Sequence, residues 1–93
     1  MTVIAMDNGS DKLRGELKKW LLEIKPGVFV GRPSALVREH LWRHVCGSIG
    51  VIGAVLVYNT NTEQGFAMKM YGIPYRKVVD LDGIQLISIE ECR

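Results

Sequence analysis

The chain has 93 residues, of which 47% are hydrophobic and 24% are charged, and this balance excludes a disordered chain. The length fits a single domain, residues 1–93, and no apolar run reaches the roughly 18 residues that a membrane-spanning helix needs. Lys and Arg number 12 against 10 Asp and Glu, and the resulting net charge of +2 is too small to identify a partner.

The N-terminal part of the chain predicts a strand followed by a helix. Residues 2–7, with apolar side chains at positions 3–6, indicate a short buried strand, which runs into the turn signal Asn8-Gly9-Ser10. Ser10 or Asp11 can cap a helix that ends at Pro26-Gly27. The apolar face of this helix is expected to consist of Leu13, Leu17, Trp20, Leu21 and Ile24.

A second strand and a second helix are expected next. Residues 28–30 form a short strand that Gly31 stops, and Pro33 suits the first turn of a helix. This helix is expected to end at Gly47. Its apolar stripe consists of Val37, Leu41 and Val45, with Trp42 beside it.

The C-terminal half predicts strands only. Residues 51–58 form a near-continuous apolar run, and residues 66–71 alternate between apolar and other side chains, so the two segments indicate a β-hairpin around the polar turn 59–65. Residues 72–83 are expected to form a long loop, and residues 84–89 a last strand.

These elements predict an α+β fold of the ferredoxin-like sandwich type. Two helices would pack on one face of a mainly antiparallel sheet, and the last strand would be an extra C-terminal edge strand. A sheet covered on one side leaves its other face open, and a second copy of the chain can cover it. We therefore expect a homodimer.

Asp7 is the most informative single residue, because it lies where an apolar strand gives way to a turn. This position is typical of a turn-forming or helix-capping Asp. The functional alternative is a ligand for Mg²⁺ or Mn²⁺, since Mg²⁺ commonly uses only one or two carboxylates. Two copies of Asp7 across a two-fold axis could then hold a metal that activates water against a phosphodiester.

Basic residues in two places are candidates for binding phosphate. Lys12 and Arg14 lie at the start of the first predicted helix, and Arg76 and Lys77 lie in the predicted long loop. Residues 25–47 also carry four cations against Glu39 alone. Scattered, solvated charge is the alternative interpretation of each of these groups.

Other side chains that could carry chemistry give weaker signals. His40 and His44 are four residues apart, a spacing that can hold a metal, but no Glu follows His40 as the metalloprotease pattern requires. We interpret both as surface or interface histidines. Cys46 and Cys92 are too few for a disulfide framework, and with the absence of a basic segment before the apolar start they predict a cytoplasmic protein.

Several segments in combination resemble one known family, and they are spread from Val3 to about Ile89. They are Leu13-Arg14-Gly15, residues 20–23, residues 27–31, Ser34-Ala35, Arg38-Glu39 with Trp42, residues 60–63 with Gly65-Phe66, and residues 79–83. With these segments the chain resembles the CRISPR-associated Cas2 family, in its type I-E (Escherichia coli-like) branch.

The resemblance implies a homodimer of ferredoxin-like protomers, flanked by two dimers of the Cas1 integrase. That complex captures foreign double-stranded DNA and inserts it as spacers into a CRISPR array, and this protein would be its central bridge. By position, Asn8, Lys12, Arg14 and Arg76 match family residues that contact DNA. Tyr75 stands where the type I-E pattern has a second arginine, so the resemblance implies a weaker DNA contact there unless Lys77, two residues further on, replaces it.

The resemblance also places Asp7 at the family's acidic strand-end position, where many members bind a divalent metal and some are credited with cleaving RNA or DNA. Two hypotheses follow: a DNA-binding scaffold for spacer acquisition, and a Mg²⁺- or Mn²⁺-dependent endonuclease acting through paired Asp7 residues. Whether the chain is an enzyme stays open between them. A third class, a small metabolite-binding regulatory domain, would need a convergent polar set that the sequence does not show.

Overall fold

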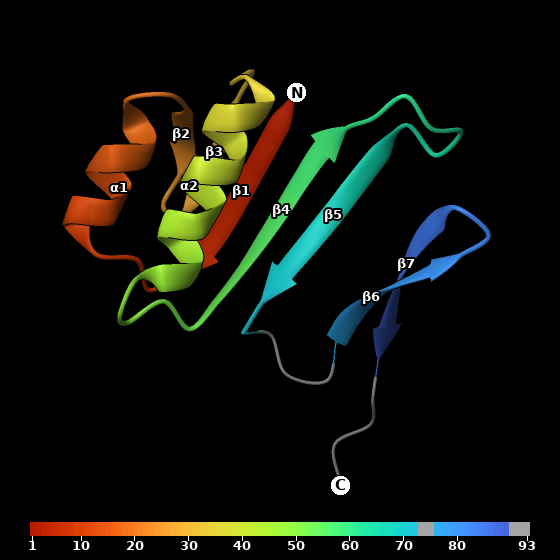
Figure 1. Cartoon of the computed structure of the whole chain (residues 1–93). Helices are drawn as coiled ribbons and strands as arrows, with labels where there is room; N and C mark the ends of the chain where they lie inside the picture. The colour runs from red at the N-terminus through yellow and green to blue at the C-terminus, as the bar shows by residue number, and fades with distance from the viewer. Residues whose placement is uncertain (73–75, 90–93) are drawn as a thin grey trace, which may run out of the picture.

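The computed structural model describes residues 1–72 and 76–89, with the backbone alone at residues 76, 77 and 89. Within these ranges the elements are β1 (Thr2–Asp7), α1 (Asp11–Lys18), β2 (Leu22–Lys25), β3 (Val28–Gly31), α2 (Ala35–Gly47), β4 (Gly53–Asn59), β5 (Phe66–Tyr71), β6 (Arg76–Leu81) and β7 (Ile84–Ile89). Figure 1 shows both helices on the same face of the main sheet.

The main sheet has the strand order β2-β3-β1-β4-β5, and every neighbouring pair in it is antiparallel. Helix α1 connects β1 to β2, and α2 connects β3 to β4, so each connection crosses over the strand that lies between its ends. This arrangement confirms the predicted ferredoxin-like α+β sandwich, with β5 added at one edge.

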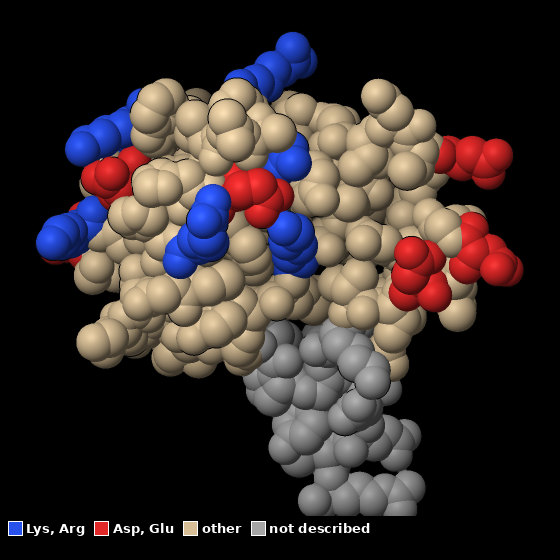
Figure 2. All heavy atoms as spheres, viewed as in Figure 1, with Lys and Arg blue, Asp and Glu red and all other residues tan. Residues whose placement is uncertain are grey.

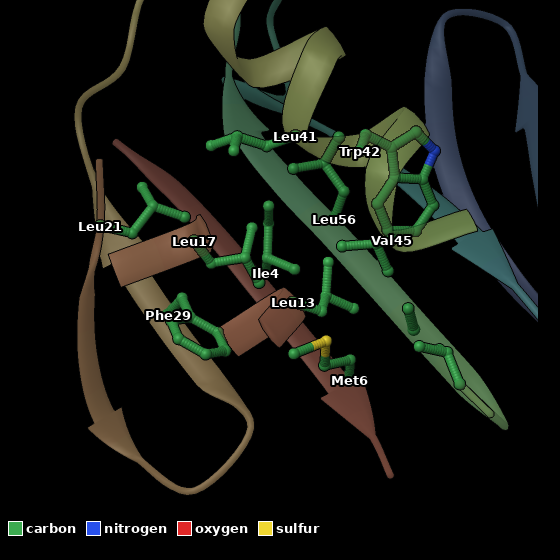
Figure 3. Packing of buried hydrophobic residues seen from close by; sticks show 12 residues of the cluster. Ile4, Met6, Leu13, Leu17, Leu21, Phe29, Leu41, Trp42, Val45 and Leu56 are labelled. Carbon is green, nitrogen blue, oxygen red and sulfur yellow. The ribbon is translucent and has the colours of Figure 1, made fainter. Parts of the chain in front are cut away.

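The core lies between the helices and the sheet (Figure 3). Strand β1 alternates as a sheet strand must, with Ile4 and Met6 buried against the helices while Val3 and Ala5 face the other side. Ser10 and Ser34 cap the two helices, because each side-chain oxygen accepts the backbone N–H three residues later. The side chains that are almost completely buried are Phe29, Ile4, Leu17, Leu41, Leu56 and Val45.

The first predicted helix was too long, because α1 ends at Lys18 and residues 22–25 form strand β2. Trp20 and Ile24, which the helical pattern placed on the apolar face, are 54% and 59% exposed. Leu21 alone of the last turn reaches the core. Residues 22–25 instead pair with β3 as an antiparallel strand. Without this pairing, β3 would be an edge strand with unpaired backbone N–H and C=O groups.

The predicted loop over residues 72–83 was also wrong for its second part, where β6 pairs with β7. The two strands turn at Asp82 and Gly83, which both have positive φ, as a two-residue type I′ hairpin requires. The C-terminal strand is therefore not an edge strand of the main sheet but half of a separate two-stranded sheet. In the described ranges, no helix is long and apolar enough to cross a membrane.

Candidate nucleic-acid interface

The end of β1 brings together three of the candidate site residues. The backbone carbonyl of Asp7 accepts the N–H of Ile52 at 3.2 Å, which fixes the strand end, while the Asp7 side chain is exposed. Asn8 has φ 63°, a left-handed conformation that Asn tolerates and that turns the chain toward α1. Asp7, Asn8 and Arg14 line one shallow hollow, together with residues of the Pro26-Gly27 turn.

Asp7 is the one carboxylate among the described residues that line this hollow. Within the described ranges, no group of three or more His, Cys, Asp or Glu side chains is close enough to hold an ion. A single exposed carboxylate leaves most of the coordination shell of Mg²⁺ or Mn²⁺ to water or substrate. The paired site expected from the sequence would therefore need a second copy of the chain.

Arg14 is bound within the protein rather than free. Its Nε and Nη2 lie 3.1 and 3.0 Å from Oε2 of Glu23, and Glu23 also accepts the backbone N–H of Gly27 at 3.1 Å. Lys18 Nζ lies 3.3 Å from the other carboxylate oxygen. The Gly27 N–H, with Arg14 and Lys18 adding to it and burial opposing, lowers the pKa of Glu23 below its ordinary value.

Lys12 differs from Arg14, because it is exposed on α1 and makes no ion pair with any carboxylate of the described ranges. The same holds for Lys25, Arg32 and Arg43, which are also exposed. These three belong to the locally basic segment 25–47, so the signal that could have identified them was present in the sequence. Arg38, the fourth cation of segment 25–47, differs from these three because its guanidinium group contacts another side chain of the protein.

Arg38 lies with its guanidinium carbon 3.8 Å from the ring centre of Tyr58, a cation–π geometry. The next residue, Glu39, binds Lys69 of β5 at 2.9 Å and so joins α2 to that strand. The Lys69 hydrogen bond lowers the pKa of Glu39, with burial opposing it. These contacts make Arg38 and Lys69 parts of the fold rather than free cations.

The charges are divided over the surface. Figure 2 shows Lys and Arg over the part of the molecule that holds α1 and α2. On the side that holds the β4–β5 and β6–β7 turns, the charged side chains in view are acidic. Of the exposed cations without a carboxylate partner in the described ranges, Lys12 belongs to α1 and Arg43 to α2, whereas Lys25 ends β2 and Arg32 follows β3.

Arg76 and Lys77 begin strand β6 instead of lying in a loop, with Ile89 and Ser88 as their partners in β7. The structure describes their backbone only, so their expected DNA contacts stay predictions. Tyr75, the residue that departs from the type I-E pattern, lies outside the described residues.

A comparison with protein families identifies the family of the chain, which the geometry alone does not determine. The family model described as CRISPR-associated protein (Cas_Cas2CT1978) matches residues 1–86 of the 93-residue chain. The match includes α1, α2, the whole main sheet and β6. The chain therefore belongs to this Cas2-type family of CRISPR-associated proteins.

Proposed function

We propose that this chain is the DNA-binding scaffold subunit of a type I-E CRISPR adaptation complex, a homodimer that bridges two dimers of the Cas1 integrase. The family supports a role in CRISPR adaptation. Two observations carry the scaffold proposal: an open sheet face that is apolar apart from Lys25, and exposed cations on the two helices, Lys12 and Arg43, that make no ion pair in the described ranges.

The open face of the main sheet supports dimerisation. Directly opposed residues in an antiparallel sheet point to the same face, so the register defines two rows across it. The first row is Leu22, Val30, Val3, Val57 and Met68, and the second is Lys25, Val28, Ala5, Val55 and Met70. Every member of the two rows is apolar except Lys25 at the β2 edge, and no helix covers them (Figure 1). A second copy packed on the same face would remove this apolar area from water.

The exposed cations support binding to the phosphate backbone of double-stranded DNA. Lys12 offers an ammonium group that no carboxylate of the described ranges neutralises, and it lines the hollow between α1 and α2 rather than the one at Asp7. Phosphate contacts of this kind position a protein on DNA without reading sequence. They suit a subunit that must accept fragments of any sequence.

The β6–β7 hairpin supports contact with Cas1. Leu81, Ile84 and Leu86 are 58%, 44% and 45% exposed there, and the hairpin lies beyond the β5 edge of the main sheet (Figure 1). Exposed apolar side chains gathered on one small sheet are typical of a surface that a partner covers.

The alternative function, a Mg²⁺- or Mn²⁺-dependent endonuclease, depends on Asp7. Its carboxylate is exposed and makes no ion pair with any cation of the described ranges, so it is available to a second copy. Because one chain supplies a single carboxylate at this place, the dimer would have to complete the site.

Reconstituted spacer integration with the cognate Cas1 tests both functions. Lys12→Ala and Lys12→Ala/Arg14→Ala should reduce integration, while Lys19→Ala is the matched control because Lys19 already pairs with Glu16 at 3.1 Å. Asp7→Ala should integrate normally. Loss of integration in Asp7→Ala with the dimer and complex intact would overturn the scaffold proposal in favour of a catalytic carboxylate.

A further inference from the structure

We propose that His40 and His44 form a bidentate site for a late transition-metal ion such as Zn²⁺, separate from the Asp7 hollow. The two residues are one turn apart on the exposed face of α2, and their ring centres lie 4.5 Å from each other. The sequence alone favoured two ordinary surface histidines. The structure adds that the two imidazoles are next to each other.

The geometry fits chelation by two nitrogens. Zinc binds imidazole nitrogen at about 2.0–2.1 Å, so two nitrogens on one ion are separated by no more than about 4 Å. The ring centres lie 4.5 Å apart. From this separation, rotation of the two side chains can bring one nitrogen of each ring within the limit. The rings are tilted by 55° rather than stacked, so a nitrogen of each can face a common point. Both side chains are exposed, which leaves room for the ion and its waters.

The charged groups that face the pair come from both helices. His44 lines a hollow between α1 and α2 with Lys12, Glu16 and Ser48. After Lys19, which has the largest effect, the two imidazoles also help to lower the pKa of Glu16, so the carboxylate lies within electrostatic reach of both. Glu16 therefore favours a cation at this place, while Lys12 of α1, Lys19 directly after it and Arg43 of α2 oppose it.

The donor set determines the class of ion. No third His, Cys, Asp or Glu joins the pair in the part of the chain that the structure describes, so water completes the shell. Two imidazole nitrogens suit Zn²⁺, Ni²⁺ or Cu²⁺, whereas Mg²⁺ and Ca²⁺ require oxygen ligands. The site is thus chemically distinct from the Mg²⁺ or Mn²⁺ site hypothesised at Asp7.

Binding would connect two consecutive turns of α2. The opposite face of this helix buries Leu41 and Val45 in the core, and Ser48 closes its end by donating to the His44 carbonyl at 2.7 Å. An ion that binds the folded helix and not the unfolded chain stabilises the native state by mass action. Zn²⁺ should therefore raise the melting temperature of the protein, and the increase should disappear at acid pH as protons compete for the nitrogens.

The test is a Zn²⁺ titration of the tag-free protein, observed through the imidazole signals by proton–nitrogen NMR. The chain contains 2 histidines, so every imidazole signal belongs to the proposed site and binding to the cysteines is not mistaken for it. One nitrogen of each ring should shift, both along the same binding curve. His40→Gln or His44→Gln should weaken binding at the remaining histidine by roughly a hundredfold, since chelation is lost.

Arg43→Gln is the matched control, because Arg43 lies between the two histidines on α2 and its removal, which takes away an opposing charge, should leave Zn²⁺ binding as tight as in the wild type or tighter. Mg²⁺ at the same concentration should shift neither ring. The proposal is overturned if only one ring responds, if the two rings follow different curves, or if either single variant binds Zn²⁺ as tightly as the wild type. Each of these variants changes an exposed side chain, and an unchanged circular dichroism spectrum confirms that it folds.

Discussion

The guanidinium group of Arg14 and the carboxylate of Glu23 form a two-point contact, with Nε and Nη2 at 3.1 and 3.0 Å from a single oxygen. Glu23 belongs to β2, and its side chain is only 11% exposed. Because the same carboxylate also accepts the Gly27 N–H and contacts Lys18, it joins α1 to the turn between β2 and β3. The hollow at the end of β1 is therefore built on an internal ion pair.

Glu23→Gln should lower the free energy of unfolding near neutral pH and should make it fall less steeply as the pH decreases. The pKa of Glu23 is lowered in the folded chain, mainly by the Gly27 N–H. The unfolded chain therefore takes up the proton first as the pH falls. The Glu23 contacts contribute their full stabilisation when the pH is above the ordinary pKa of Glu, about 4.3. This contribution is lost as the pH falls through the lowered pKa of Glu23 in the folded chain.

Urea unfolding midpoints measured between about pH 3 and pH 7 check this prediction. Glu63→Gln is the control, because Glu63 is exposed and makes no ion pair with a described residue. If Glu23→Gln and the wild type lose stability in parallel as the pH falls, the carboxylate does not link the two elements as the contacts indicate.

Gln85→Ala should loosen the contact between the β6–β7 hairpin and the main sheet, because one of its three hydrogen bonds uses the Gln85 side chain. The Gln85 backbone N–H donates to Gln64 Oε1 and its carbonyl accepts from Gln64 Nε2, both at 2.7 Å, while its side-chain oxygen accepts the Met68 N–H. The variant loses the bond to Met68 and leaves a part-buried amide of β5 unpaired, at a cost of about 1–3 kcal/mol. Hydrogen exchange should accelerate in β6 and β7 and stay slow in β1 and β4. Equal exchange in wild type and variant would contradict the prediction.

How much the sequence predicts depends on whether a local pattern has a competing interpretation. Helix α2 was predicted well at its apolar face, where Leu41 and Val45 face the core, and at its end, Gly47. Its start was predicted too early, because Ser34 caps the helix and Pro33 lies before the cap rather than in the first turn. Helix α1 was extended too far, because Leu21 and Ile24 fit the helical period. Ile24 in fact belongs to a strand whose partner, β3, lies further along the chain. Pairing of this kind is tertiary information that periodicity does not contain.

The β6–β7 hairpin had a local signal that the sequence analysis did not use. Asp82-Gly83 between two apolar segments is a strong sign of a two-residue turn. At the candidate site, Asp7, Asn8 and Arg14 were predicted individually, and the structure brings them around one hollow. The commitment of Arg14 to Glu23 was not predictable, because it depends on the strand that the helical pattern concealed.

Leu41→Ala should destabilise the protein much more than Leu36→Ala, although both variants change α2. Leu41 is completely buried between the helix and the sheet, whereas Leu36 is 84% exposed. Leu41→Ala should therefore cost about 2–5 kcal/mol of the free energy of unfolding through lost burial and the remaining cavity. Leu36→Ala should change it by less than about 0.5 kcal/mol. Urea denaturation measures both, and equal values would mean that α2 does not pack on the sheet through Leu41.

Lys12→Ala should weaken binding to duplex DNA more than Lys19→Ala, if the proposed function is correct. Both residues are exposed on or next to α1, but Lys19 pairs with Glu16 and Lys12 makes no pair in the described ranges. Loss of one phosphate contact should lower the slope of log K against log salt by about 1 per protomer. Fluorescence anisotropy across a salt series, with Cas1 present, gives the slopes. Identical slopes for the two variants would remove Lys12 from the DNA-binding surface.

If the proposed dimer forms through the open sheet face, Val57→Lys should shift the protein from dimer to monomer, because Val57 lies in the middle of the apolar row across that face. Its direct neighbours on that face are Val3 of β1 and Met68 of β5. A charge without a partner in a closed interface costs about 3–5 kcal/mol, which weakens the dimer by roughly a hundredfold or more.

Ile49→Lys is the matched control, since Ile49 is 99% exposed in the loop after α2. Light scattering over a range of concentrations measures both. If Val57→Lys remains dimeric with unchanged affinity, the two protomers meet elsewhere, and the open face must be assigned to a different partner.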